Sequence, residues 1–224
     1  MEISALNLAS LVYINLHYNC HNCTFFPLQT PRLSRIFFSR PMGSGILLPQ
    51  ALIQFSLCPR LETLHLRMPA KLPRISSTAT YGNLKQLNLD IILFRILVQE
   101  EDDVDVNCVL DLLKAAPLLE ELIILVVGGH LSETNPQEMR NHSGFTNDHL
   151  KMVKMKGFLG HWYETQLAIG ILENAPKLKV LVIDPFEKHY SDDGKYPENY
   201  SEQHMAVVEE KLKGVKTDAQ ILFL

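Results

Sequence analysis

The sequence has little cysteine, no long apolar run and no excess of positive charge. Its 224 residues include four cysteines, too few for a fold of this length that depends on disulfides. The longest apolar run, residues 122–127, is too short to span a bilayer. Lysine and arginine total 21 against 25 aspartates and glutamates, so the net charge is −4. This balance argues against binding to nucleic acid or to an anionic membrane surface.

The first residues do not resemble a secretory signal. Glu2 stands where a signal peptide carries basic residues, and Ser4, Asn7 and Ser10 interrupt the apolar residues that follow. We therefore expect a cytoplasmic or nuclear protein.

One pattern returns along the chain, with apolar residues at offsets 0, 3 and 5. Its clearest copy is Leu61/Leu64/Leu66. Further copies are Leu33/Ile36/Phe38, Leu84/Leu87/Leu89, Leu119/Leu122/Ile124, Leu150/Val153/Met155 and Leu178/Leu181/Ile183. An earlier copy fits both Leu8/Leu11/Tyr13 and Leu11/Ile14/Leu16, so its register is open. L-x-x-L-x-L is the core of a leucine-rich repeat.

The pattern predicts the fold class. Residues at offsets 3 and 5 lie two apart and share one face of a short strand. Stacked copies then form a parallel sheet over a continuous core, and each return path has room for a helix. We predict an irregular α/β leucine-rich-repeat solenoid over residues 1–185, with strands on the concave face and helices on the convex face. Residues 186–224 are predicted to form a C-terminal cap.

Helices and a last strand are readable between the repeats. Apolar residues at helical spacing predict helices over residues 47–57, 106–116, 165–174 and 203–213. The first three stop just before Pro59, Pro117 and Pro176. Residues 219–224 are predicted to form a closing strand. Successive repeats start 23 to 35 residues apart, which indicates loop insertions, most clearly the polar residues 128–147.

A repeat solenoid binds through the exposed side of its strands, at offsets 2, 4 and 6 of each copy. The residues that we expect to contact a protein partner are Arg35, Phe37, His65, Arg67, Asn88, Asp90, Lys154, Lys156 and Asp184. The pairs Ile123/Leu125 and Val180/Val182 are apolar at such positions. Either a ligand covers them, or residues 128–147 and the C-terminal segment do, and we favour the second interpretation.

Motifs for catalysis are missing. No nucleophile elbow, phosphate loop or dinucleotide-binding motif occurs, so we expect neither enzymatic activity nor a cofactor. Cys20 and Cys23, with His17 and His21, could hold zinc, but an ordinary loop is the simpler interpretation and we predict no metal.

Two other segments allow two interpretations each. The acidic residues 100–103 lack the spacing of a calcium loop and indicate a solvated loop. Trp162, with His161 and Tyr163, is expected in a loop before a helix. This aromatic cluster is either an exposed interface anchor or packs between repeats.

From residue 149 onward the sequence resembles the FBD region of plant F-box/leucine-rich-repeat proteins. The phrases that carry this resemblance are residues 149–153, 157–160, 172–175 and 181–185, and residues 58–64 and 83–89 are similar to that family's repeats. The resemblance implies the substrate-recognition region of a cullin-type ubiquitin ligase subunit. The family's N-terminal F-box is not recognisable here, so binding to the ligase adaptor is not expected.

Two alternatives stay open beside a protein-interaction scaffold. One is a small-ligand receptor, for which Arg35, Phe37 and Arg67 supply basic and apolar groups. The other is a truncated gene product without an independent role.

Overall fold

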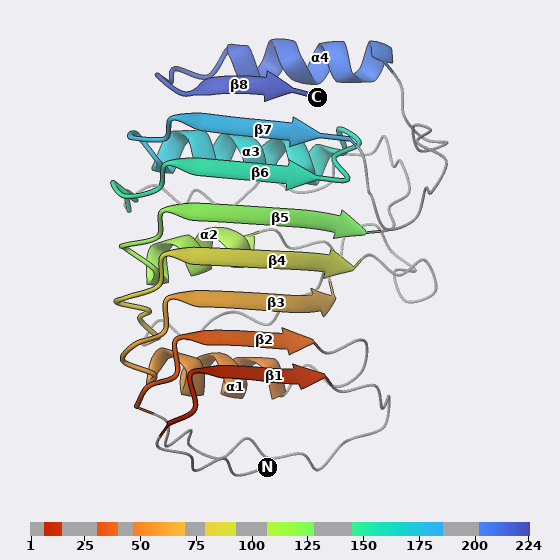
Figure 1. Cartoon of the computed structure of the whole chain (residues 1–224). Coiled ribbons are helices and arrows are strands. Elements are labelled where there is room, and N and C mark those ends of the chain that lie inside the picture. The colour runs from red at the N-terminus through yellow and green to blue at the C-terminus, as the bar shows by residue number, and fades with distance from the viewer. Residues whose placement is uncertain are drawn as a thin grey trace.

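Eight parallel strands form a single sheet whose strand order follows the chain (Figure 1). The computed structural model describes residues 7–14, 31–39, 47–69, 79–92, 107–127, 145–185 and 202–224. The strands are β1 (Ser10–Ile14), β2 (Arg35–Ser39), β3 (Thr63–Pro69), β4 (Gln86–Ile92), β5 (Glu121–Val127), β6 (Met152–Lys156), β7 (Val180–Asp184) and β8 (Gln220–Phe223). Each strand pairs with the next one along the chain, which confirms the predicted stacking of repeats.

The register places the same repeat position at the same height on neighbouring strands. Leu64 on β3 lies opposite Leu87 on β4, which lies opposite Leu122 on β5. All three side chains are fully buried. Because side chains alternate between the two faces of a strand, the aligned repeats give the sheet one continuous apolar face.

The two ends of the sheet decide the register of the first repeat and the presence of the closing strand. Leu11 pairs with Ile36 and is buried, whereas Ile14 is 56% exposed. The first repeat is therefore Leu8/Leu11/Tyr13, and the alternative register is wrong. At the other end, the predicted closing strand is present as β8 and continues the sheet beside β7.

A tight turn leads into several strands. The backbone N–H of the first repeat leucine donates to the carbonyl three residues earlier, as from Leu61 to Cys58 and from Leu178 to Ala175. Pro59 and Pro176 occupy the second position of these turns, where the fixed φ of proline fits. Before β6, Asn147 replaces this turn, because its side-chain oxygen accepts the backbone N–H of Leu150 at 3.0 Å.

Helices α1, α2 and α3 lie behind the sheet (Figure 1). The four helices are α1 (Leu47–Ser56), α2 (Asn107–Ala115), α3 (Trp162–Asn174) and α4 (Glu202–Lys213), close to the predicted spans except that α3 begins three residues early. Within the described ranges, no helix combines the length and the apolar character that a membrane crossing requires.

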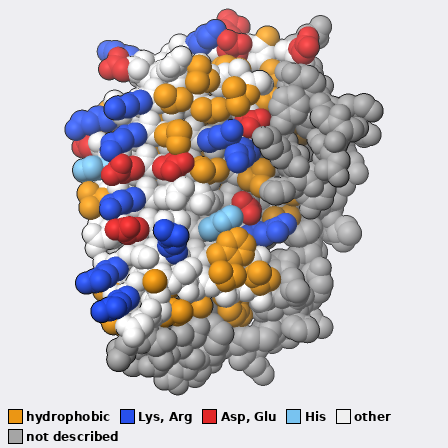
Figure 2. Space-filling view, viewed as in Figure 1, with side chains coloured by type: hydrophobic (Ala, Val, Ile, Leu, Met, Phe, Trp, Pro, Cys, Tyr) orange, Lys and Arg blue, Asp and Glu red, His pale blue; other side chains and the backbone are white. Residues whose placement is uncertain are grey.

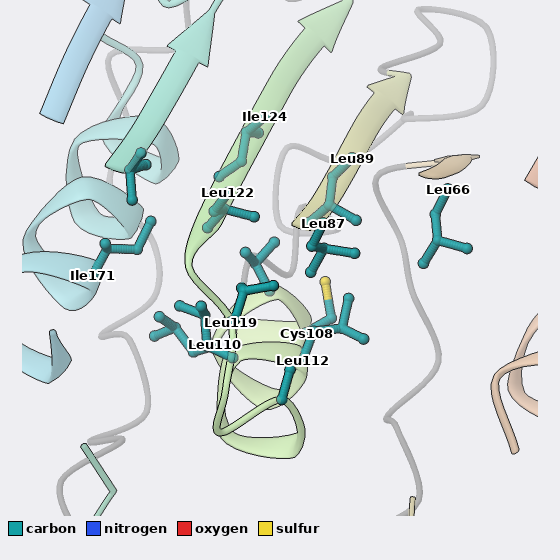
Figure 3. Close-up of a cluster of buried hydrophobic side chains, with 14 of the residues drawn as sticks. Leu66, Leu87, Leu89, Cys108, Leu110, Leu112, Leu119, Leu122, Ile124 and Ile171 are labelled. Atoms are coloured by element: carbon teal, nitrogen blue, oxygen red, sulfur yellow. The ribbon is translucent and has the colours of Figure 1, made fainter. Parts of the chain in front are cut away.

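The core lies between the helices and the sheet. Figure 3 shows Leu110 and Leu112 of α2 beside the inward leucines of β4 and β5, including Leu87 and Leu122. All four side chains are fully buried. Met205, Val208 and Leu212 of α4 belong to the same hydrophobic cluster, so the C-terminal helix continues this layer.

The alternation along β4 predicts losses of very different size for two neighbouring residues. Leu87→Ala removes a fully buried side chain and should lower the free energy of unfolding by about 2–5 kcal/mol. Asn88→Ala should cost less than about 1 kcal/mol, because Asn88 points outward and its buried Oδ1 has no hydrogen-bond partner. Urea unfolding followed by circular dichroism measures both. Equal losses would mean that the inward and outward positions of β4 are misassigned.

Candidate functional site

Outward side chains form three rows across the strands, on the side of the sheet away from α1–α3. We call this surface the open face; it is turned toward the viewer in Figure 2. The middle row runs through Val12, Phe37, His65, Asn88, Ile123, Lys154, Val182 and Leu222. All the residues predicted to bind a partner lie on these rows, and their contact with a partner stays a prediction.

Over β2–β4 the open face carries a cluster of three interacting side chains. The Phe37 ring meets the His65 ring edge to face, with centroids 4.6 Å apart. His65 Nε2 lies 3.1 Å from Asp90 Oδ2. This is an ion-pair distance, although Nε2 has no hydrogen bond of good geometry. The contacts join β2, β3 and β4 and hold the three side chains in place.

Two arginines flank this cluster. Arg35 is exposed on β2, and Arg67 is half-buried on β3 beside Asp90 in the register. Among the described residues, neither guanidinium forms an ion pair. Asn88, between His65 and Ile123 in the middle row, also lacks a hydrogen-bond partner for its Oδ1 within the described part of the chain.

Over β5–β8 the open face is an apolar floor with two lysines in it. Lys154 Nζ lies 3.1 Å from Asp184 Oδ2, and Ile123 and Val182 flank Lys154 in the middle row. Lys156 is half-buried one row further on. Apolar side chains surround basic ones in this part of Figure 2.

The C-terminal segment was predicted to cover this floor, but β8 does not cover it. Ile123/Leu125 and Val180/Val182 are all half-buried. The described part of the C-terminal segment, 202–224, adds β8 beside β7 and so extends the floor sideways, with Leu222 next to Val182. Residues 128–144 and 186–201, on which the rest of that prediction depends, lie outside the described residues.

Outside the three rows of the open face, a line of charged residues lies where the turns enter the strands. Lys85 Nζ lies 3.2 Å from Glu62 Oε1, and Lys151 Nζ lies 2.7 Å from Glu120 Oε2. The hydrogen bond from Lys151 lowers the pKa of Glu120. These pairs are exposed and contribute little stability, so they indicate a solvated edge of the sheet.

The aromatic cluster around Trp162 is part of the fold, and the prediction of a loop is wrong. Trp162 and Tyr163 form the first turn of α3, and His161 is its buried N-cap residue. The rings of His161 and Tyr163 stack at 5.1 Å. Trp162 is half-buried against the core. Packing between repeats, the second of the two interpretations, is therefore confirmed.

Glu164 explains the early start of α3, and sequence reasoning missed it. Its Oε2 accepts the backbone N–H groups of His161 at 2.9 Å and Leu159 at 3.0 Å. Burial raises the pKa of Glu164 to about 8, against the opposite effect of these donors. Glutamate three residues after an N-cap position is the sequence signal that could have revealed it.

The loop that Glu164 organises also touches the end of β5. Gly157 has φ of 67°, and a Cβ there would collide with the carbonyl oxygen of Val126. Phe158 N–H donates to the carbonyl of Asp184 at 3.2 Å. The connection from β6 to α3 is therefore tied to the carboxyl ends of the strands on both sides.

Comparison with known proteins identifies the repeats. The family model described as "At1g61320/AtMIF1, LRR domain" matches residues 1–219. The chain belongs to this leucine-rich-repeat family. No curated protein and no solved structure matches the chain. The match covers the leucine-rich-repeat part of the resemblance seen in the sequence and not its F-box-related part.

Members of leucine-rich-repeat families are typically interaction proteins without enzymatic activity. In the described part of this At1g61320/AtMIF1-type domain, no three His, Cys, Asp or Glu side chains come together as a metal site. Cys20, Cys23 and the acidic residues 100–103 lie outside the described residues. Burial raises the pKa of the Cys58 thiol, the opposite of what a reactive thiolate needs.

The buried Glu164 predicts a pH dependence of stability. The folded protein keeps a proton on Glu164 up to about pH 8, while the unfolded chain releases it near the ordinary pKa of 4.5. Between these values the folded state binds more protons, so its stability falls as pH rises, by up to about 1.4 kcal/mol per pH unit.

Glu164→Gln removes this titration. Urea unfolding at pH 5, 6, 7 and 8 should show a shallower decline in stability for the variant than for the unaltered protein. Parallel pH profiles for the two proteins would contradict the assignment of this titration to Glu164.

Proposed function

We propose that the chain is a non-enzymatic scaffold that binds another protein across the open face of its sheet. The observation that carries this proposal is the organisation of that face. Three rows of aligned side chains run across the sheet, two of them over all eight strands and one as far as β7. The chemistry of the rows changes from aromatic and polar at β2–β4 to apolar at β5–β8. A bound protein would contact side chains of many strands, and each contact would contribute a small part of the affinity.

Partial burial of these side chains supports the proposal. Phe37, His65, Asp90, Lys154 and Val182 are half-buried in the free chain. The ring contact of Phe37 with His65, the close approach of His65 to Asp90 and the ion pair between Lys154 and Asp184 already restrict their rotamers. A partner would therefore lose less side-chain entropy on binding than at a face of freely rotating side chains.

We also propose that the bound protein is a substrate of a cullin-type ubiquitin ligase and that the chain acts in the cytoplasm or nucleus. This finer proposal is supported by the resemblance of residues 149–185 to the FBD region of F-box/leucine-rich-repeat proteins. Expressed on their own, residues 1–224 would occupy the substrate through the open face, since no adaptor-binding module is recognisable within them.

A photo-crosslinking residue tests which face binds. Benzoylphenylalanine at Asn88, in the middle of the open face, should capture discrete proteins in cells of the source species. The same residue at Ile53, 37% exposed on α1 in the helix layer, should not. Phe37→Ala combined with His65→Ala should abolish the capture at position 88. Capture only at position 53, or equal capture at both positions, would overturn the proposal.

The ligase proposal has its own readout. Overexpression of the chain should lengthen the cellular half-life of the protein captured at position 88, because the chain would compete with a complete ligase receptor. A cycloheximide chase measures this half-life, with the Phe37→Ala/His65→Ala variant as control. An unchanged half-life would contradict the ligase connection while leaving the scaffold proposal standing.

A further inference from the structure

The carboxylates of the open face already lie within interaction distance of neighbouring side chains of the same chain. Asp90 faces His65 at 3.1 Å, and Asp184 faces Lys154 at 3.1 Å. Glu121 Oε2 accepts a hydrogen bond from Gln86 Nε2 at 3.2 Å. Each of these contacts joins two adjacent strands. Asp184 is thus paired with a cation, whereas Asp90 and Glu121 have neighbouring side chains of this chain close to their oxygens.

Most of the described cations of the same face have no ion-pair partner. Arg35, Arg67 and Lys156 form no ion pair or side-chain hydrogen bond with another described residue. Lys154 is the exception, through Asp184. The outward rows carry four cations against three carboxylates, whereas the whole chain has a net charge of −4. The open face is therefore less acidic than the molecule as a whole.

The spacing of the cations matches a segment that crosses the strands. Arg67 and Lys156 occupy the same row, on β3 and β6, through aligned residues of β4 and β5. Three strand spacings separate them, about 14 Å at the backbone. Apolar side chains are exposed around Lys154 and Lys156, with Met152 on the same strand 38% exposed and Leu222 on β8 36% exposed.

We propose that the partner of the open face is an acidic protein segment. Its carboxylates would meet Arg35, Arg67 and Lys156, and its apolar side chains would lie on the floor over β5–β8. Complementary charge would steer the encounter and fix the register, and apolar burial would supply affinity. This inference rests on the proposed function and adds the chemistry of the partner to it.

Nucleic acid fits the same charges less well. A polyphosphate needs a dense basic patch, whereas this face interleaves its cations with Asp90, Glu121 and Asp184. Exposed apolar side chains such as Met152 and Leu222 have no role against phosphates. An acidic segment with apolar side chains uses both kinds of group.

A library of random 12-residue peptides displayed on phage, panned on the full chain, tests the proposal. Enriched peptides should carry several aspartates or glutamates next to leucine, isoleucine, valine or phenylalanine. Their affinity, measured with synthetic peptides, should fall at least tenfold for Arg35→Gln/Arg67→Gln/Lys156→Gln and should weaken with added salt. Replacing the peptide carboxylates with amides should cause a similar loss.

The matched control changes three cations elsewhere by the same amount. Arg60, Lys177 and Lys179 are exposed in or next to the turns that enter the strands. Arg60→Gln/Lys177→Gln/Lys179→Gln should leave the affinity within twofold. Thermal melting of both triple variants checks that each still folds, and Lys156→Arg should retain binding because it retains the charge.

The possible outcomes separate this inference from the proposed function. Peptides without acidic enrichment, or equal losses in the two triple variants, would overturn the acidic partner while position 88 still captures proteins. Stronger binding of a labelled duplex or single-stranded oligonucleotide than of the peptides would also overturn it. Loss of capture at position 88 would remove the proposed function and the inference together.

Discussion

Burial of one row of apolar residues per strand is the constraint on which the rest of the structure depends. A single strand such as β4 has only Leu87 and Leu89 as central inward anchors, and it cannot bury them alone. Stacking against β3 and β5 covers these side chains from both sides, and α2 covers them from below. The parallel order, the long returns and the tight turn before several of the strands all follow from this requirement.

The same stacking decides what the open face can do. Residues 23 to 35 positions apart in the chain become neighbours on adjacent strands, about 4.8 Å apart at the backbone. His65 thereby meets Asp90, and Lys154 shares a row with Ile123 and Val182. The face thereby gains contacts within itself that engage its carboxylates. The side chains left without an ion-pair partner among the described residues are mainly cationic and apolar, and the pairs within the face join residues of different repeats.

The repeat pattern was enough to predict the sheet, its strand order and which residues face outward, because offsets 0, 3 and 5 constrain each strand directly. It could not choose the register of the first copy, since both alternatives have apolar residues at the right offsets and only pairing with Ile36 decides. The start of α3 depends on hydrogen bonds to a buried carboxylate, Glu164, which hydrophobic spacing does not show. The rows of the open face were predictable, but the pairings within them depend on side-chain conformation across strands.

Because side chains alternate along each strand, the residues that stabilise the fold differ from the residues that lie on the open face. On β4, Leu87 and Leu89 are buried in the core, whereas Gln86, Asn88 and Asp90 lie half-buried on the open face. Every second residue can therefore change without disturbing the packing beneath it. Such a chain can exchange one binding partner for another through successive substitutions in the outward rows, each nearly neutral for folding, and so its specificity can evolve much faster than its architecture.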